Sequence, residues 1–211
     1  FAPNEMRTML ATDFEANEPA RLQLADCPKF GNGIPTVDNL ARRIAAFVYN
    51  EIRSFTRPHG GRFIPSHIMF TTYAHAGASV GALPDGRHAG DPLADSAGPV
   101  QGRDRNGPTA MLRSVAGLPL HLAVGTPVLN VRLSKASVKD EDGRRRLRAL
   151  IEGYFGMGGM QLQFTLLDRE ELEDAMLPPA RPEDLIVRIG GFADSLNGRS
   201  AELKQEVVKR T

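Results

Sequence analysis

Few residues of this chain have the type and spacing for nucleophilic or metal chemistry. Gly77-Ala-Ser79-Val-Gly81 has the spacing of the serine hydrolase nucleophile turn, which needs a strand before it and a helix directly after it. A Pro-Asp-Gly turn follows here, so we do not predict a serine hydrolase. The five histidines form no His-Glu-x-x-His pair, and His67 with His75 would still lack a third zinc ligand. Cys27 has no neighbouring histidine or charged helix start that would activate a thiolate.

The other candidates are the two adjacent glycines near the carboxyl end, Gly190 and Gly191. They follow a strand-like run, Leu185 to Ile189, and precede Phe192. Glycine has no Cβ and adopts backbone shapes that other residues avoid. From these residues alone, the simplest interpretation is a Gly-Gly turn at the end of a strand.

The composition is that of an ordinary globular protein, and the length allows one sizeable core or two small ones. The 211 residues are 41% hydrophobic and 24% charged, and the net charge is +1. This balance gives no reason to expect nucleic acid or a membrane as a partner. The one basic run, Arg144 to Arg148, stands beside three acidic residues and is interpreted as a solvated helix face. A single cysteine excludes an internal disulfide and favours a reducing compartment, so we expect the cytoplasm.

Hydrophobic periodicity predicts the elements that must position any site. Apolar residues at helical spacing predict a helix over 36–55, and a second helical face includes Leu147, Leu150 and Tyr154. Alternation predicts strands over 64–73, 128–133 and 160–166, and a helix is expected to open at Asp168. Residues 77–107 are rich in Gly, Pro and Asp and predict a long ordered loop. Alternating strands and helices indicate an α/β fold with parallel pairing.

Several segments, in order along the chain, resemble the glycyl radical enzymes. They are Pro28-Lys-Phe-Gly-Asn32, Gly77 to Arg87 with its Pro-Asp-Gly-Arg ending, Gly107-Pro-Thr-Ala110, Met160 to Gln163, and Arg188-Ile-Gly-Gly191-Phe with the terminal Arg210-Thr211. One departure is Gly33-Ile-Pro, which replaces an acidic run of the family. The chain begins at Phe1, and we expect it to be the carboxyl-terminal portion of a longer enzyme.

The resemblance implies an α/β fold that is part of a ten-stranded β/α barrel. Residues 1–98 would form the carboxyl-terminal part of the pyruvate formate-lyase-like barrel domain, and residues 99–211 the glycine radical domain. The family's radical glycine directly precedes an aromatic residue, which assigns the radical to Gly191. A radical on this α-carbon is stabilised when it lies flat between two amides, and a Cβ would crowd that geometry.

The resemblance also implies a chemistry. A separate activating enzyme, using S-adenosylmethionine and an iron–sulfur cluster, would remove a hydrogen atom from Gly191, and no cofactor would stay bound. The radical would pass to a cysteine in a Gly-Cys-x-Glu loop, which this chain lacks, for cleavage or formation of a substrate C–C or C–X bond. A lyase, dehydratase or decarboxylase is expected, sensitive to oxygen and anaerobic, with the remainder of the barrel and a second copy as partners.

The resemblance implies that the strand from His67 to Thr72 lines the active site on alternate residues. Ile68 and Phe70 would face the pocket with Thr72 at its edge, which favours an apolar or aryl substrate. The alternative is that these side chains only pack the core. Two other functions also remain open: a radical-bearing repair subunit, and a non-catalytic homologue that acts as a binding scaffold.

Overall fold

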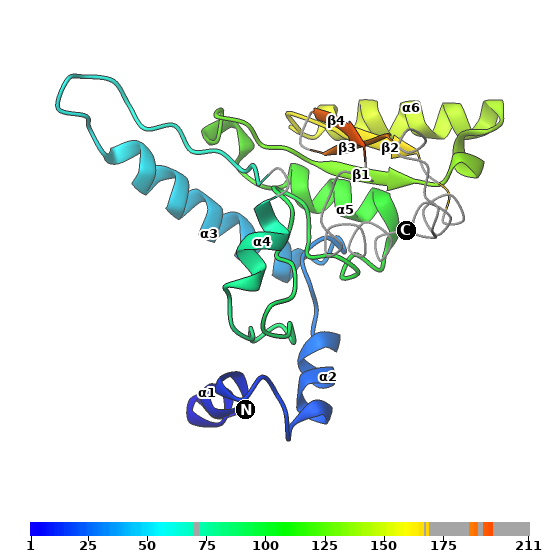
Figure 1. Cartoon of the computed structure of the whole chain (residues 1–211). Coiled ribbons are helices and arrows are strands. Elements are labelled where there is room, and N and C mark those ends of the chain that lie inside the picture. The colour runs from blue at the N-terminus through cyan, green and yellow to red at the C-terminus, as the bar shows by residue number, and fades with distance from the viewer. Residues whose placement is uncertain (70–71, 167, 169–185, 190–191, 196–211) are drawn as a thin grey trace.

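The computed structural model describes residues 1–69, 72–166, 168, 186–189 and 192–195 (Figure 1). The α-helices are α1 (Pro3–Ala11), α2 (Glu18–Asp26), α3 (Pro35–Ser54), α4 (Thr72–Ala78), α5 (Gly107–Ala116) and α6 (Glu141–Gly156). The 3₁₀ helices are η1 (Leu120–Leu122) and η2 (Lys135–Val138), and the strands are β1 (Asn130–Leu133), β2 (Gln163–Leu166), β3 (Ile186–Ile189) and β4 (Phe192–Ser195).

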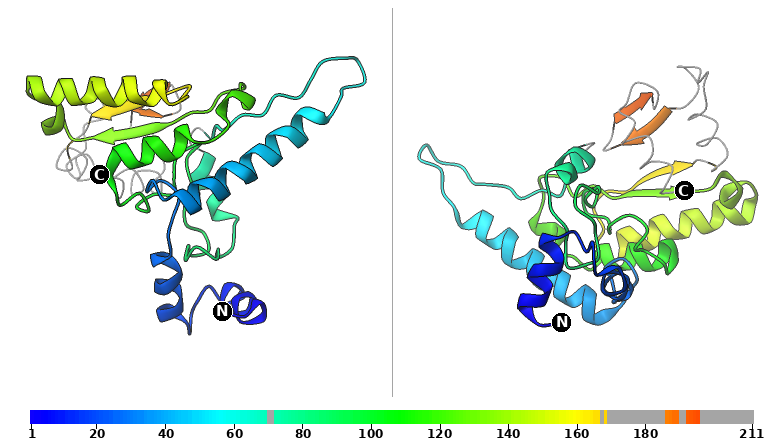
Figure 2. Two further views of the ribbon diagram at one scale, coloured as in Figure 1. Left: turned by 180° about the vertical axis from the view of Figure 1, so that it is seen from behind. Right: turned by 60° about the horizontal axis from the view of Figure 1, so that its bottom comes forward.

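The main core forms where α5, β1 and α6 meet. Leu112 and Val115 of α5, Leu129 before β1 and Tyr154 of α6 are all at most 1% exposed. β1 pairs with β2 in parallel, and α6 connects the two strands, as Figures 1 and 2 show. The α/β architecture and the parallel pairing predicted from the sequence are confirmed. The described residues contain two sheets of two strands each, and the ten-stranded barrel is not visible among them.

Helix α6 begins where the sequence places an acidic cap before a basic run. Asp140 accepts a hydrogen bond from the Gly143 amide at 2.6 Å and satisfies one free donor of the first turn. Arg144 lies 2.9 Å from Glu141, and Arg148 lies 2.7 Å from Glu152. These pairs are exposed and span one helical turn, so the interpretation of the run as a solvated face is confirmed.

Helix α3 confirms the predicted helix, and its apolar stripe faces away from the core. Ala45 and Tyr49 are the buried residues of α3 and belong to the main core. The side chains of the apolar stripe are exposed: Phe47 is 67% exposed and Leu40 56%. Figure 1 shows α3 and the loop after it extending away from α5 and β1.

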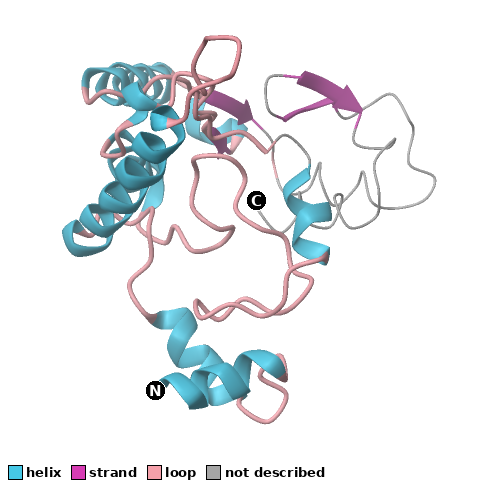
Figure 3. Ribbon diagram, turned by 90° about the vertical axis from the view of Figure 1, so that its left-hand side faces the viewer, coloured by secondary structure: helices cyan, strands magenta, loops and turns pink. Residues whose placement is uncertain are grey.

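The prediction of a strand over 64–73 is wrong. The segment makes one isolated parallel bridge, His67 with Pro127, and the chain enters helix α4 at Thr72. Pro65 has no amide to donate to a ladder, and the three alanines of α4 favour a helix over an extended chain. The long loop after α4 is confirmed, and Figure 3 shows loop segments joining α1 and α2, at one end of the molecule, to the other helices.

Candidate radical site and its supporting loops

The predicted radical glycine separates two strands that the structure describes. The strand expected over 185–189 is confirmed as β3, which pairs antiparallel with β4. Ile189 is the register partner of Phe192, the first residue of β4. Gly190 and Gly191 lie outside the described residues, so the assignment of the radical to Gly191 stays a prediction. The residues after Asp168, where a helix is expected to open, and the terminal Arg210-Thr211 also lie outside them.

The segment expected to line a substrate pocket is held at His67 by two backbone hydrogen bonds. The His67 amide donates to the Thr126 carbonyl, and the Val128 amide donates to the His67 carbonyl, each at 3.0 Å. Ile68 is half-buried, whereas Thr72 is exposed and donates its hydroxyl to the Met69 carbonyl at 2.5 Å. Phe70 lies outside the described residues. The pocket role of Ile68, Phe70 and Thr72 therefore stays a prediction.

A buried tyrosine holds the histidine of this segment. The Tyr49 hydroxyl lies 2.8 Å from Nδ1 of His67, and the two rings meet edge to face. Burial raises the pKa of Tyr49 to about 12 and lowers the pKa of His67, so both side chains are neutral near pH 7. The sequence carries no signal for this pair, because the two residues lie on different elements. The pair gives His67 a structural role.

A buried arginine organises the loop from residue 77 to residue 92. Arg87 is 3% exposed, and its guanidinium donates to main-chain carbonyl groups instead of to a carboxylate. The acceptors are the carbonyls of Gly77, Val80, Gly81, Asp91 and Pro92. The bonds to Gly77 and Gly81 are 2.8 Å long. A planar group with five donors suits this task, because it can satisfy several carbonyls that converge in one place.

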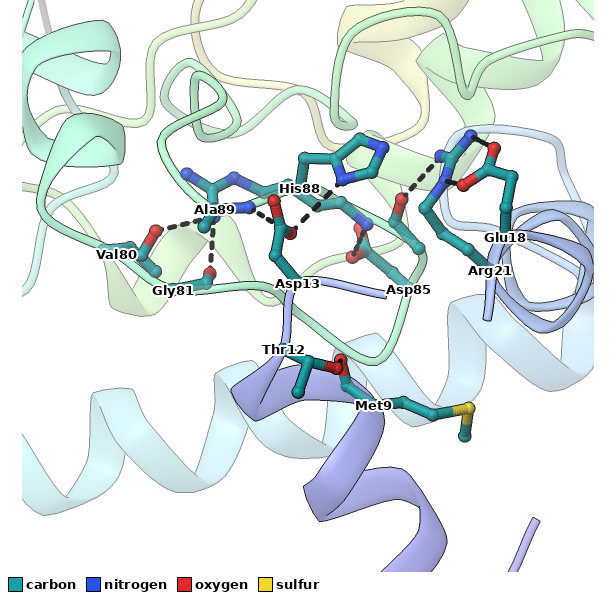
Figure 4. A network of polar contacts seen from close by, with 12 residues as sticks. Met9, Thr12, Asp13, Glu18, Arg21, Val80, Gly81, Asp85, His88 and Ala89 are labelled. Atoms are coloured by element: carbon teal, nitrogen blue, oxygen red, sulfur yellow. Dashed lines mark hydrogen bonds and ion pairs between the residues drawn. The ribbon is translucent and has the colours of Figure 1, made fainter. Parts of the chain in front are cut away.

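The same loop is fastened to the amino-terminal helices. Asp13 accepts hydrogen bonds from the Ala89 amide at 2.8 Å and, on the same oxygen, from His88 Nδ1 at 3.2 Å (Figure 4). The Ala89 amide is the main cause that lowers the pKa of Asp13. Arg21 donates to the Gly86 carbonyl at 3.0 Å and pairs with Glu18. The 1–26 region and the 77–92 loop therefore form one connected unit.

Within the described ranges, no group of three His, Cys, Asp or Glu side chains could hold a metal ion. Cys27 is exposed and free. None of the described helices combines the length and the apolar character that crossing a bilayer requires.

Two family models match the chain on either side of the loop. Residues 93–197 match the model described as Glycine radical, and residues 1–77 match the model described as Pyruvate formate lyase-like. The chain belongs to the glycyl radical enzyme family. The resemblance drawn from the sequence is thereby confirmed.

Individual glycyl radical enzymes are similar to this chain over nearly its whole length. It is 33% identical to trans-4-hydroxy-L-proline dehydratase of Clostridioides difficile over 100% of its length, and 34% identical to formate acetyltransferase 1 of Escherichia coli over 96%. The glycerol-bound B12-independent glycerol dehydratase of Clostridium butyricum is similar in structure, with a TM-score of 0.95 at 34% identity over 100% of this chain. The chain covers 27% of each of these three proteins, and so spans about a quarter of their length.

The segment Pro28 to Asn32, which resembles one of the family, also has a structural role. The Asn32 amide group donates to the carbonyls of Lys29 and Arg103, and its oxygen accepts from the amides of Arg105 and Asn106 at 2.8 and 3.0 Å. One side chain thus joins the 28–32 segment to the turn that leads into α5. Neither the family resemblance nor residue spacing indicated this role.

Proposed function

We propose that this chain is the carboxyl-terminal part of a glycyl radical enzyme of the lyase, dehydratase or decarboxylase type. Gly191 stores the radical and passes it to a cysteine thiyl that lies outside these 211 residues. The observation that carries the proposal is the Glycine radical match over 93–197, which includes Gly191 and both strands beside it. We keep the division into a barrel part, 1–98, and a radical domain, 99–211, as part of the proposal.

The partners follow from the same chemistry. A radical S-adenosylmethionine activating enzyme removes one hydrogen atom from the α-carbon of Gly191, and no cofactor stays bound to this chain. The remainder of the barrel supplies the cysteine loop, and the complete enzyme is a homodimer that works without oxygen, in the cytoplasm. The single cysteine, exposed and free, suits a reducing compartment.

The substrate class rests on the segment before α4. Relatives of nearly equal identity are named for dehydration and for acetyl transfer, so identity alone does not separate the reactions. The apolar side chains of Ile68 and Phe70, with Thr72 at the edge, favour an apolar or aryl-bearing substrate in the complete enzyme. The half-burial of Ile68 is compatible with this role.

The decisive experiment compares the two adjacent glycines in the complete enzyme. Gly191→Ala should abolish the radical signal in anaerobic electron paramagnetic resonance after treatment with the activating enzyme. Gly190→Ala should retain at least part of the signal, because the family pattern uses this position only for close packing. Mass spectrometry after exposure to air should map chain cleavage to Gly191. Cleavage at Gly190, or a full signal from Gly191→Ala, would overturn the assignment.

A radical-bearing repair subunit is the second candidate function. It is favoured by the absence of a Gly-Cys-x-Glu segment from these 211 residues. A Gly-Cys-x-Glu segment on the same polypeptide would exclude it.

A further inference from the structure

Three chain segments, one of them the segment expected to line the substrate pocket, are joined in a closed ring of hydrogen bonds. The Val128 amide donates to the His67 carbonyl at 3.0 Å, and the Ala97 amide donates to the Val128 carbonyl at 2.9 Å. The Met69 amide donates to the Ser96 hydroxyl at 3.1 Å. Each segment is thereby bonded to the other two, and the bond of Ser96 is the one in this ring that a side chain makes.

Ser96 makes its bond from a backbone conformation that serine rarely adopts. Its φ is +58°, in the left-handed region where a Cβ crowds the following carbonyl oxygen. Its neighbours Asp95 and Ala97 are each 3% exposed, so the packing around them fixes the backbone here. Glycine would adopt this conformation without strain, but it has no hydroxyl for the Met69 amide. Serine at this position therefore supplies a contact to the segment before α4 that the less strained residue would not.

The contacts on each side of Ile68 fix where this residue lies. Before it, His67 is held by its two backbone hydrogen bonds and by the Tyr49 hydroxyl. After it, the Met69 amide has the Ser96 hydroxyl as its acceptor. Peptide groups are planar, so fixing the groups on both sides restricts the two backbone dihedrals of the residue between them. The half-buried Ile68 is therefore pre-organised, and binding an apolar group there requires less ordering of the segment.

We propose that Ser96 is a positioning residue of the substrate pocket: its hydroxyl holds the Met69 amide and so fixes Ile68 against the apolar part of a substrate. The inference rests on the proposed function, which places Ile68 in that pocket. Ser96 lies between two segments that resemble the family, 77–87 and 107–110, and neither the resemblance nor residue spacing gives it a role. Because Ser96 acts through Ile68, its loss should change the binding of an apolar group more than the stability of the fold.

The test uses the complete enzyme before activation and separates the order of the segment from overall stability. In Ser96→Gly, relief of the left-handed conformation is offset by the lost hydrogen bond and by the freer unfolded chain, so the urea midpoint should change little. Hydrogen–deuterium exchange should still show the protection of the Met69 amide falling by about twofold to tenfold, which corresponds to one hydrogen bond. The dissociation constant of benzyl alcohol, a small aryl probe, should rise by a similar factor in isothermal titration calorimetry.

Two further variants show whether the hydroxyl is the cause. Ser96→Asn keeps an acceptor and tolerates the left-handed region, so it should restore part of the protection and part of the binding. Asp13→Gly is the matched control, because it also relieves a left-handed residue, at φ +50°, and removes the acceptor of an amide, that of Ala89. It should release the Ala89 amide and leave both Met69 protection and benzyl alcohol binding unchanged.

The outcomes are distinct. Lower Met69 protection and weaker binding in Ser96→Gly at an unchanged urea midpoint, with recovery in Ser96→Asn, support the proposal. Unchanged Met69 protection overturns it, as does unchanged binding of benzyl alcohol after the protection is lost. A urea midpoint that falls in step with the protection would make Ser96 a residue of overall stability alone and also overturns it. If the wild-type enzyme does not bind benzyl alcohol, the apolar pocket of the proposed function is wrong, and Met69 protection still decides whether Ser96 holds the segment.

Discussion

Replacing Arg87 with methionine should release the loop from residue 77 to residue 92. Methionine keeps much of the apolar volume of the side chain and removes every donor. The carbonyls of Gly77, Gly81 and Asp91 make its shortest bonds and would lose a charged donor, and Gly77 is itself buried. At about 1 to 1.5 kcal/mol for each carbonyl, the loop should open more easily by about 3 to 4.5 kcal/mol.

Hydrogen–deuterium exchange of the complete enzyme measures this opening directly. The amides of Leu83 and Gly90 report on it, because they donate to the carbonyls of Arg87 and Val80 at 3.0 and 3.1 Å. Since about 1.4 kcal/mol corresponds to a tenfold change, exchange at these amides should accelerate by roughly 100-fold to 1,000-fold.

Two control variants test whether the hydrogen bonds of the Arg87 guanidinium hold the loop. Arg87→Lys keeps the charge but has three donors in place of five, so its exchange should lie between wild type and Arg87→Met. Arg105→Met removes an exposed ion pair with Asp26 and should leave the loop unchanged. If Leu83 and Gly90 exchange at the wild-type rate in Arg87→Met, the guanidinium does not hold the loop and the reasoning fails.

Three further changes test other parts of the protein. Residues 1–211 expressed alone should aggregate, because Phe47 and its apolar neighbours on α3 are exposed; a monodisperse monomer in sedimentation would contradict this. Burial depresses the pKa of His67 below its usual 6.5, so the stability it contributes is present above that pH and lost as pH falls through the folded pKa. The protection of the Val128 amide relative to its intrinsic exchange rate should therefore fall below about pH 6.5, and His67→Gln should remove that fall. Gly143→Ala should destabilise the enzyme by about 1 to 3 kcal/mol, because the added Cβ overlaps η2. Gly153→Ala should stabilise α6 by about 0.5 to 1 kcal/mol, because the space around Gly153 is open. Urea unfolding midpoints of both variants equal to that of the wild type would refute both predictions.

The elements with clear periodicity were predictable from the sequence, and their environments were not. Helices α3 and α6 and the strands of the parallel pair follow from the spacing of apolar residues. The direction of the apolar stripe of α3 does not, because periodicity reports that one face is apolar and not what covers it. The segment 64–73 misled for a related reason. Its apolar residues suit a strand, but a strand needs a partner along its length, and among residues 64–69 and 72–73, which the structure describes, His67 alone makes a bridge.

The hydrogen bonds that hold the loops could not be predicted from the sequence, for a different reason. Arg87 and Asn32 bind main-chain groups, and a carbonyl or amide acceptor has no residue type by which it could be recognised. The pair of Tyr49 and His67 joins two elements whose contact only the fold determines.

In the described segments that resemble the family, the residues Gly77, Arg87 and Asn32 shape loops and take no part in chemistry. A Cβ on Gly77 would overlap the Asp91 carbonyl, so glycine there permits the same turn that Arg87 closes. Asn32 ties its own segment to the turn before α5. None of these side chains presents an acid, a base or a nucleophile, because each is occupied by main-chain groups. Under the proposed function, the reactive centre supplied by this chain is a backbone carbon at Gly191, and Arg87 and Asn32 serve to hold loops of the fold.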